Sequence, residues 1–201
     1  MNRFTDMTVA QLLTALSSAE PTPGGGTAAA IAGALGTSLL VMVAGLAKSK
    51  NNLDDEKAAL AQARAAIEPI TARLMQLADA DTQAFNDVMA AYRLAKSTDD
   101  EKTTRSRAIQ AALRRATEVP LETLRASAGA LTHARVVAAH GNPSAASDVG
   151  VAIGLLTAAA EGAAANVRIN LTGLKDEAFK GETEAETARL WGAARAGQDT
   201  R

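Results

Sequence analysis

Apolar residues recur along this chain at steps of three and four positions, which is the period of an amphipathic α-helix. The pattern predicts helices throughout and contains no convincing run of strand type. The expected helices span about 8–16, 27–48, 54–96, 97–139, 144–171 and 175–196. Because the helices are long and their connections short, the sequence predicts an all-α bundle of long antiparallel helices.

Prolines, capping residues and a glycine mark where these helices bend, begin or end. Pro69 and Pro120 fall inside the two longest helices and predict kinks there. Thr98 with Glu101 fits a capping box, in which each side chain satisfies a backbone donor near the other residue. Gly141 is placed to end a helix in the left-handed conformation.

The segment from Thr27 to Leu46 carries no charged residue and is long enough to cross a bilayer. It also contains Gly33, Gly36 and Thr37, and the remaining helices have a water-soluble, amphipathic pattern. A helix that is apolar on all sides is what the centre of a bundle requires. We therefore expect a buried alanine- and glycine-rich central helix and no membrane span.

Composition narrows the class of protein further. The chain has 201 residues, of which 47% are hydrophobic and 2% aromatic, so we expect one domain over 1–201 with a core of closely packed small side chains. A net charge of −1 gives no electrostatic reason to expect nucleic acid or an anionic membrane as partner. With no cysteine and two histidines, neither disulfides nor a metal site is expected. The amino-terminal residues show no secretory pattern, which favours the cytoplasm.

One acidic residue lies on an otherwise apolar helix face. The face comprises Ile67, Ile70, Leu74, Leu77, Ala84 or Phe85, Val88 and Tyr92. Asp81 takes the vacant position after Leu77, whereas Asp79 falls off the face. Burial raises the pKa of a carboxyl, which is how proteins make a general acid or base that works near neutrality. Two interpretations stay open for Asp81, a catalytic group or a packing residue bonded to backbone or arginine.

Polar residues also lie on one face of the helix that begins near Ser144. This face contains Asp148, Ala152, Leu155, Ala159, Gly162, Asn166 and Asn170. Small residues between the polar ends could leave room for a ligand whose donors and acceptors the amides would read. The residues alone slightly favour another interpretation, in which Asp148 interacts with the helix dipole and the asparagines pair across a subunit contact.

The stretch "PTPGGG" at 21–26 directly precedes the apolar helix. It could be a flexible linker, the neck of an anchor, or a loop that brings backbone close to a ligand. Its glycines match no phosphate-loop signature, so they are not a sign of a nucleotide.

Three long stretches together resemble one family. They are "PTPGGGTAAAIAGALG", "DADTQAFNDVMAAYRLAKSTDDEK" and "GNPSAASDVGVAIGLLTAAAEGAAANVRINL". In order, and over nearly the whole chain, they resemble the cyclodeaminase domain of formiminotransferase-cyclodeaminase and the stand-alone bacterial methenyltetrahydrofolate cyclohydrolases. The resemblance implies an all-helical, cytoplasmic homodimer that acts on a tetrahydrofolate derivative as substrate, with no bound cofactor and no metal.

The resemblance also implies roles for particular residues. Asp81 matches the position of the catalytic acid/base, although Thr82 follows it where the family has alanine. The positions that match substrate-binding motifs are Gly24, Gly25, Gly26, Lys48, Asn142, Asp148, Asn166 and Asn170. The chain departs from the family at Ala95, where proline is usual, and in "AKSKNN" after the apolar helix, where glycine and lysine cluster.

Three functions follow as hypotheses. The first is hydrolysis of 5,10-methenyltetrahydrofolate to 10-formyltetrahydrofolate, with Asp81 as general acid and base. The second is a cyclodeaminase that closes formiminotetrahydrofolate to the methenyl compound and releases ammonia. The first is preferred because no formiminotransferase domain accompanies the sequence. The third is a helical dimer that serves as a binding or scaffold protein without catalysis.

Overall fold

The computed structural model describes residues 4–46 and 53–196, and every regular element in these ranges is a helix. The helices are η1 (Phe4–Asp6), α1 (Val9–Leu16), α2 (Gly25–Gly45), α3 (Asp54–Tyr92), α4 (Asp99–His140), η2 (Pro143–Ala145), α5 (Ala146–Leu171) and α6 (Glu177–Ala196). The predicted all-α fold is therefore confirmed. The expected boundaries agree closely with those of the structure.

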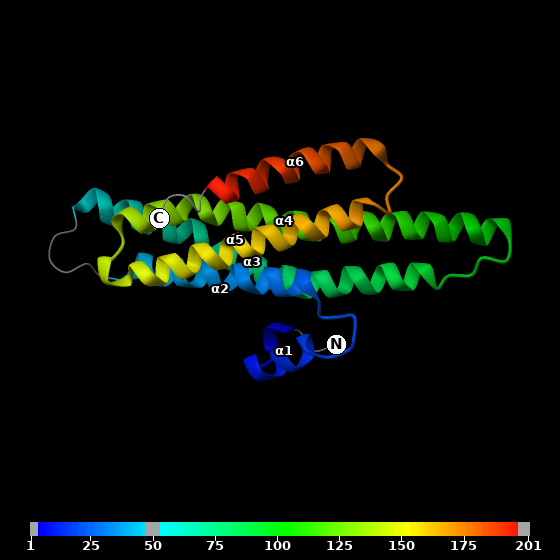
Figure 1. Ribbon diagram of the computed structural model, residues 1–201, viewed down its shortest axis with the longest axis horizontal. Coiled ribbons are helices and arrows are strands. Elements are labelled where there is room, and N and C mark those ends of the chain that lie inside the picture. The colour runs from blue at the N-terminus through cyan, green and yellow to red at the C-terminus, as the bar shows by residue number, and fades with distance from the viewer. Residues whose placement is uncertain (1–3, 47–52, 197–201) are drawn as a thin grey trace.

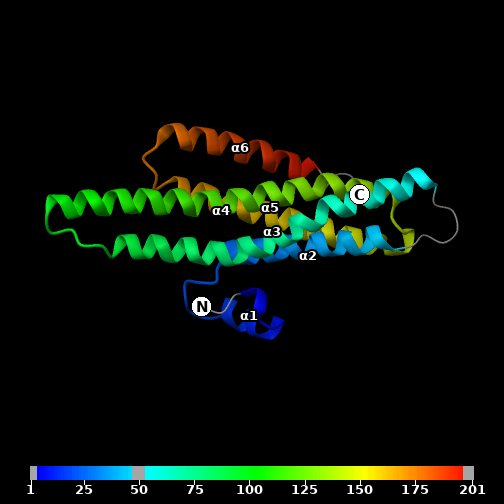
Figure 2. The same ribbon diagram turned by 180° about the vertical axis from the view of Figure 1, so that it is seen from behind.

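The long helices α2, α3, α4 and α5 pack together as a bundle, whose arrangement can be followed in Figure 1. Helix α2 packs against α3 and α5, and α4 packs against the same two helices from the opposite corner. Successive helices run in opposite directions because each connection is short. Helix α6 lies on α4 and α5, and α1 stands beside the bundle on its α2 side, as Figure 2 also shows from behind.

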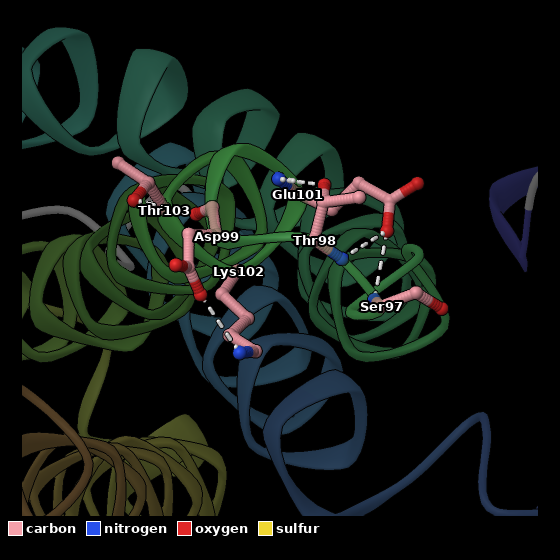
Figure 3. A network of polar contacts seen from close by, with 6 residues as sticks. All are labelled: Ser97, Thr98, Asp99, Glu101, Lys102 and Thr103. Atoms are coloured by element: carbon pink, nitrogen blue, oxygen red, sulfur yellow. Dashed lines mark hydrogen bonds and ion pairs between the residues drawn. The ribbon is translucent and has the colours of Figure 1, made fainter.

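The start of α4 follows the predicted capping chemistry. The Thr98 hydroxyl accepts a hydrogen bond from the Glu101 amide at 3.2 Å, and the Glu101 carboxylate accepts from the Thr98 amide at 2.9 Å (Figure 3). The same carboxylate accepts from the Ser97 amide at 2.7 Å. Otherwise unpaired donors of the first helical turn are thereby satisfied, which fixes where α4 begins.

One local prediction needs correction. Gly141 caps α4 with φ −66° and ψ 174°, so it is extended and not left-handed. The chain continues straight into Asn142 and Pro143, and an extended residue leads directly into that turn. Pro69 and Pro120 lie within helices that continue on both sides of them, so neither proline interrupts its helix, and the bends expected there stay a prediction.

The apolar face of α3 is confirmed at its centre and is wrong at its end. Ile67, Leu74 and Leu77 are fully or almost fully buried, whereas Tyr92 is 47% exposed and Ala91 is buried in its place. The ends of α3 and α4 extend beyond α2 and α5 (Figure 1), so the last turn of α3 packs chiefly on α4. The Tyr92 carbonyl there accepts a hydrogen bond from Arg105 at 3.0 Å.

Helix α2 is buried where it faces its neighbours. A Cβ added at Gly36 would lie 2.9 Å from the Ala152 carbonyl oxygen, so glycine permits the close approach of α2 and α5. On its outer side, Leu35 is 55% exposed and Met42 is 43% exposed. The predicted burial of α2 therefore holds for its inner faces only.

Within the described residues, two segments are long and apolar enough to cross a membrane by length and composition alone. These are Gly25–Gly45, with mean hydropathy 1.9 and 44% of its window buried, and Pro143–Leu171, with mean hydropathy 1.3 and 50% buried. Core helices of water-soluble bundles have the same properties. Because each segment packs against other helices of this chain, its apolarity is weak support for a membrane span.

Candidate active site

A cavity of about 310 Å³ opens where the glycine loop meets the bundle. Four helices and the loop before α2 contribute to its wall. The lining residues are Pro21, Thr22, Gly24, Gly25, Gly26, Asp81, Ala84, Phe85, Val88, Leu113, Ala116, Asn166 and Asn170. The wall thus combines apolar side chains with one carboxyl and two carboxamides, as sites for small organic molecules do.

Asp81 is the ionisable residue of this wall. Helix α3 presents it toward the start of α2, where the Thr27 hydroxyl donates a hydrogen bond to Asp81 Oδ2 at 3.2 Å. Burial raises the pKa of Asp81, and hydrogen bonds from the Thr27 hydroxyl and amide oppose that rise. The packing alternative expected a backbone or arginine partner, and the described structure supplies the backbone amide of Thr27 together with its hydroxyl, so the position of Asp81 in the cavity wall is what favours the catalytic interpretation.

The first turn of α2 receives the Asp81 side chain. Gly24 is the N-cap residue of α2 and provides no side-chain cap. The amino end of a helix carries partial positive charge and unpaired N–H groups, so a carboxylate from α3 is stabilised there. Asp81 therefore combines a desolvated position, which favours the neutral form, with local donors, which favour the charged form.

The three consecutive glycines are not equivalent. A Cβ added at Gly26 would lie 2.1 Å from Asp81 Oδ1, so only glycine leaves room for the carboxyl as it stands. A Cβ at Gly25 would meet nothing within 4 Å, and one at Gly24 would lie 3.6 Å from the Pro21 carbonyl oxygen. The glycine loop therefore makes space for the acid at one position and faces the cavity at the others.

The two asparagines near the end of α5 reach the same cavity. Asn170 Nδ2 donates to the Ala116 carbonyl oxygen on α4 at 2.7 Å, which fixes the orientation of its amide. Asn170 thus pairs within the chain, contrary to the alternative that places it in a subunit contact. Asn166 lies one turn earlier on the same face and also lines the wall.

Other predicted residues do not belong to this cavity. Asp148 lies in the first turn of α5, about 27 Å from Asn166 along the helix axis at 1.5 Å per residue. The side chain of Asn142 accepts a hydrogen bond from the Ser144 amide at 2.9 Å and caps η2 at that same end of the bundle. Lys48 lies outside the described residues.

Several residues of the site were not predicted. Phe85 and Val88 line the cavity, and their place on the apolar face of α3 was the available signal. No pattern in the sequence pointed to Thr27, because its hydrogen bond to Asp81 joins residues 54 positions apart. Leu113 and Ala116 of α4 likewise read as ordinary core positions.

This arrangement suits proton transfer to and from a cationic or polar heterocycle. A carboxyl in apolar surroundings can act as general base when ionised and as general acid when protonated. Its charge would also attract a positive centre strongly, since little solvent intervenes. The amides of Asn166 and Asn170 can orient a ligand that carries ring donors and acceptors.

The family model described as formiminotransferase-cyclodeaminase matches residues 8–189 of the chain. The chain belongs to the formiminotransferase-cyclodeaminase family. The match includes the glycine loop, the whole of α3 with Asp81, and both asparagines of α5. The predicted resemblance is confirmed.

Relatives within the formiminotransferase-cyclodeaminase family are named for cyclohydrolase, formimidoyltransferase and cyclodeaminase activities. The methenyltetrahydrofolate cyclohydrolase of Methylorubrum extorquens is 41% identical over 91% of this chain and 88% of its own length. The formimidoyltransferase-cyclodeaminase of Gallus gallus is 36% identical over 87% of this chain, which spans only 32% of that longer protein. The crystal structure of formiminotetrahydrofolate cyclodeaminase from Thermotoga maritima superposes with a TM-score of 0.85 at 27% identity, covering 97% of this chain and 93% of that one.

Proposed function

We propose that this protein hydrolyses 5,10-methenyltetrahydrofolate to 10-formyltetrahydrofolate. The observation that carries the proposal is the position of Asp81, whose carboxyl is the one ionisable group among the described residues that line the cavity. The methenyl substrate is a cation, and a buried carboxylate favours a positive charge placed beside it. The cyclohydrolase of Methylorubrum extorquens, similar over nearly its full length, supports the same assignment.

The reaction requires a proton to be taken and then returned. In the first step the Asp81 carboxylate accepts a proton from water as the water oxygen bonds to the methenyl carbon, which neutralises the cationic N–CH–N unit. In the second step Asp81 gives that proton to the departing nitrogen as its bond to the carbon breaks. The new hydroxyl loses its own proton to solvent and becomes the formyl carbonyl, so one proton is released in each turnover.

A second candidate is the cyclodeaminase reaction, in which formiminotetrahydrofolate closes to the methenyl compound with loss of ammonia. The structural similarity to the Thermotoga maritima protein favours it. Asp81 would there protonate the leaving amine. The same carboxyl therefore serves either reaction, and the substrates must be compared directly.

The test is a paired assay on the purified protein. One reaction follows loss of the methenyltetrahydrofolate chromophore above its spontaneous hydrolysis, and the other follows ammonia release from formiminotetrahydrofolate. Faster loss without ammonia supports the cyclohydrolase, whereas ammonia release with methenyl formation assigns the cyclodeaminase. Absence of both activities would leave the non-catalytic scaffold as the remaining interpretation.

Asp81→Asn tests the catalytic assignment within that assay. We expect kcat to fall about 100-fold or more, because the amide cannot exchange the proton. Asp87→Asn is the matched control: Asp87 lies on the same helix, is exposed, and accepts a hydrogen bond from Gln83 at 2.8 Å. Full turnover by Asp81→Asn, with Asp87→Asn also active, would contradict a catalytic role for Asp81.

We further propose that the protein works as a homodimer in the cytoplasm, as one domain, and without a bound cofactor or metal. The exposed apolar residues Leu35 and Met42 on α2 support association through this side of the bundle. The proposed reaction needs only water and a proton carrier, which supports catalysis by the side chains alone.

A further inference from the structure

Two buried hydroxyls lie directly behind Asp81, on the side away from the cavity wall. Thr27 is 0% exposed and Thr82 is 2% exposed. Thr27 Oγ1 lies 3.2 Å from Asp81 Oδ2, 3.3 Å from Thr82 Oγ1 and 3.1 Å from the Ala78 carbonyl oxygen. One oxygen atom of α2 thus meets three polar groups of α3.

A hydroxyl carries one proton and two lone pairs, so Thr27 cannot donate fully to all of these acceptors at once. With Asp81 ionised, Thr27 donates to Oδ2 and Thr82 can donate to Thr27. With a proton on Oδ1, Thr27 keeps donating to Oδ2. With a proton on Oδ2, the direction reverses: Asp81 donates to Thr27, and Thr27 donates to the Ala78 carbonyl oxygen.

In each of these protonation states the hydrogen bond between Thr27 and Asp81 Oδ2 can therefore persist without any movement of the heavy atoms. This matters because an unpaired polar group is costly in a buried site. Without such a partner, a carboxyl that acts as base in one step and as acid in the next would lose a hydrogen bond in one of the two steps.

We propose that Thr27, supported by Thr82, is a positioning residue that holds Asp81 in a single orientation while its carboxyl gains and loses a proton. The inference rests on the proposed function, since it assigns a partner to the proton carrier of that reaction. Thr82 is of special interest because it follows Asp81 in the sequence and shares the Thr27 hydroxyl with it.

The ionisable groups on the helices around Asp81 do not offer another explanation for its pKa. Helix α2 has no ionisable residue over Gly25–Gly45, and the neighbouring helices α4 and α5 line the cavity with Leu113, Ala116, Asn166 and Asn170. On α3 itself, the carboxylate of Asp79 accepts a hydrogen bond from the Phe4 amide at 2.8 Å. Among the described residues around Asp81, the hydrogen bonds from Thr27 are the local influence that opposes the effect of burial on its pKa.

The experiment replaces the Thr27 hydroxyl by a methyl group of the same shape. In the full-length protein we expect Thr27→Val to lower kcat about 10- to 100-fold with KM changed less than about threefold, because substrate contacts stay while the carboxyl loses its partner. The acidic limb of the pH profile should move to higher pH, since a bond that favours the ionised form is lost. Thr27→Ser should restore both rate and profile.

Thr37→Val is the matched structural control. Thr37 is also 0% exposed on α2, but its hydroxyl donates to the carbonyl oxygens of Gly33 and Ala34 in its own helix. We expect this variant to keep the wild-type pH profile even where it changes the melting temperature. Equal losses in Thr27→Val and Thr37→Val, with no movement of the profile, would overturn the proposal in favour of a purely structural role.

Thr82 is tested by a double-mutant cycle. Thr82→Val alone should lower kcat about threefold, and it should have no further effect in the Thr27→Val background, because Thr82 acts through Thr27. Additive effects of the two substitutions on kcat would show that Thr82 does not act through Thr27, and would overturn its supporting role.

A titration of Asp81 by NMR, with carboxyl-labelled aspartate, separates this inference from the proposed function. The midpoint should move to higher pH in Thr27→Val and stay unchanged in Thr37→Val, whether or not turnover is detected. An unchanged midpoint in Thr27→Val overturns the positioning role even when Asp81→Asn is inactive. Conversely, an active Asp81→Asn variant contradicts the proposed function, whatever the titration shows.

Discussion

Gly26 and Asp81 depend on each other for their positions. The carboxyl of Asp81 occupies the space that a side chain at residue 26 would need, with Oδ1 2.1 Å from the Cβ position. The atoms that such a Cβ meets belong to the end of a side chain, which can rotate away. A substitution at Gly26 should therefore displace the acid and leave the bundle intact.

We predict that Gly26→Ala lowers kcat about 100-fold or more, as Asp81→Asn does, because the displaced carboxyl no longer faces the reacting carbon. The melting temperature should change by less than about 4 °C, since no core contact is lost. Kinetics and thermal unfolding of the purified variant check both points. Gly181→Ala on α6, where an added Cβ meets nothing within 4 Å, is the control for added volume. An active Gly26→Ala enzyme would show that Asp81 need not occupy its observed position.

At the scale of single residues, a role could be predicted only where the contacts that define it lie close together in the sequence. Asp81 could be predicted because the three- and four-residue steps of α3 bring it inward together with Leu74 and Leu77. Thr27 could not, since a threonine after three glycines carries no sign of a partner 54 residues away. The resemblance named Asn142 and Asp148 with Asn166, but the length of α5 separates the first two from this cavity.

At the scale of the helix, α2 joins the site to the core. Its first turn receives Asp81, and its middle packs against α5 through Gly36, whose Cβ position lies 2.9 Å from both the Ala152 carbonyl oxygen and Leu156 Cγ. Small residues permit this close contact, and a backbone carbonyl cannot move aside as the end of a side chain can. A substitution at residue 36 should therefore lower the stability of the fold.

We predict that Gly36→Ala destabilises the fold by about 1–3 kcal/mol, because the added methyl forces α2 and α5 apart. Gly181→Ala, in an exposed part of α6, should instead stabilise by about 0.5–1 kcal/mol through helix propensity. Denaturant unfolding of the two variants measures both changes. A neutral or stabilising Gly36→Ala would contradict the close contact between α2 and α5.

The helices themselves were largely predictable, because period and capping act within a few residues. The Thr98 capping box is an example, with donor and acceptor three positions apart. The failures lie where tertiary context decides: Tyr92 is exposed because α3 extends past its neighbours, and Gly141 is extended because η2 follows at once. The period of apolar residues alone predicts neither the exposure of Tyr92 nor the extended conformation of Gly141.

At the scale of the whole molecule, exposed apolar residues lie on the outer surfaces of α2 and α5. Leu35 and Met42 of α2 and Val151 of α5 are all exposed, and Leu35 also lines a cavity with Val9 and Leu12 of α1. A second copy of the chain could bury these residues against the same residues of its own surface, as happens in a two-fold interface. This is the physical basis for the proposed homodimer.

We predict that Leu35→Glu converts the dimer to a monomer, because a two-fold contact brings the same residue from both copies to the interface, where each unpaired carboxylate loses its water. Sedimentation velocity at several protein concentrations measures the change. Leu94→Glu is the control, since Leu94 is exposed beyond the end of α3, on the part of the molecule that extends past α2. A wild-type protein that sediments as a monomer would contradict the dimer. A dimer that persists in Leu35→Glu would assign the contact to another face, and the apolar side of α2 would then need a different partner.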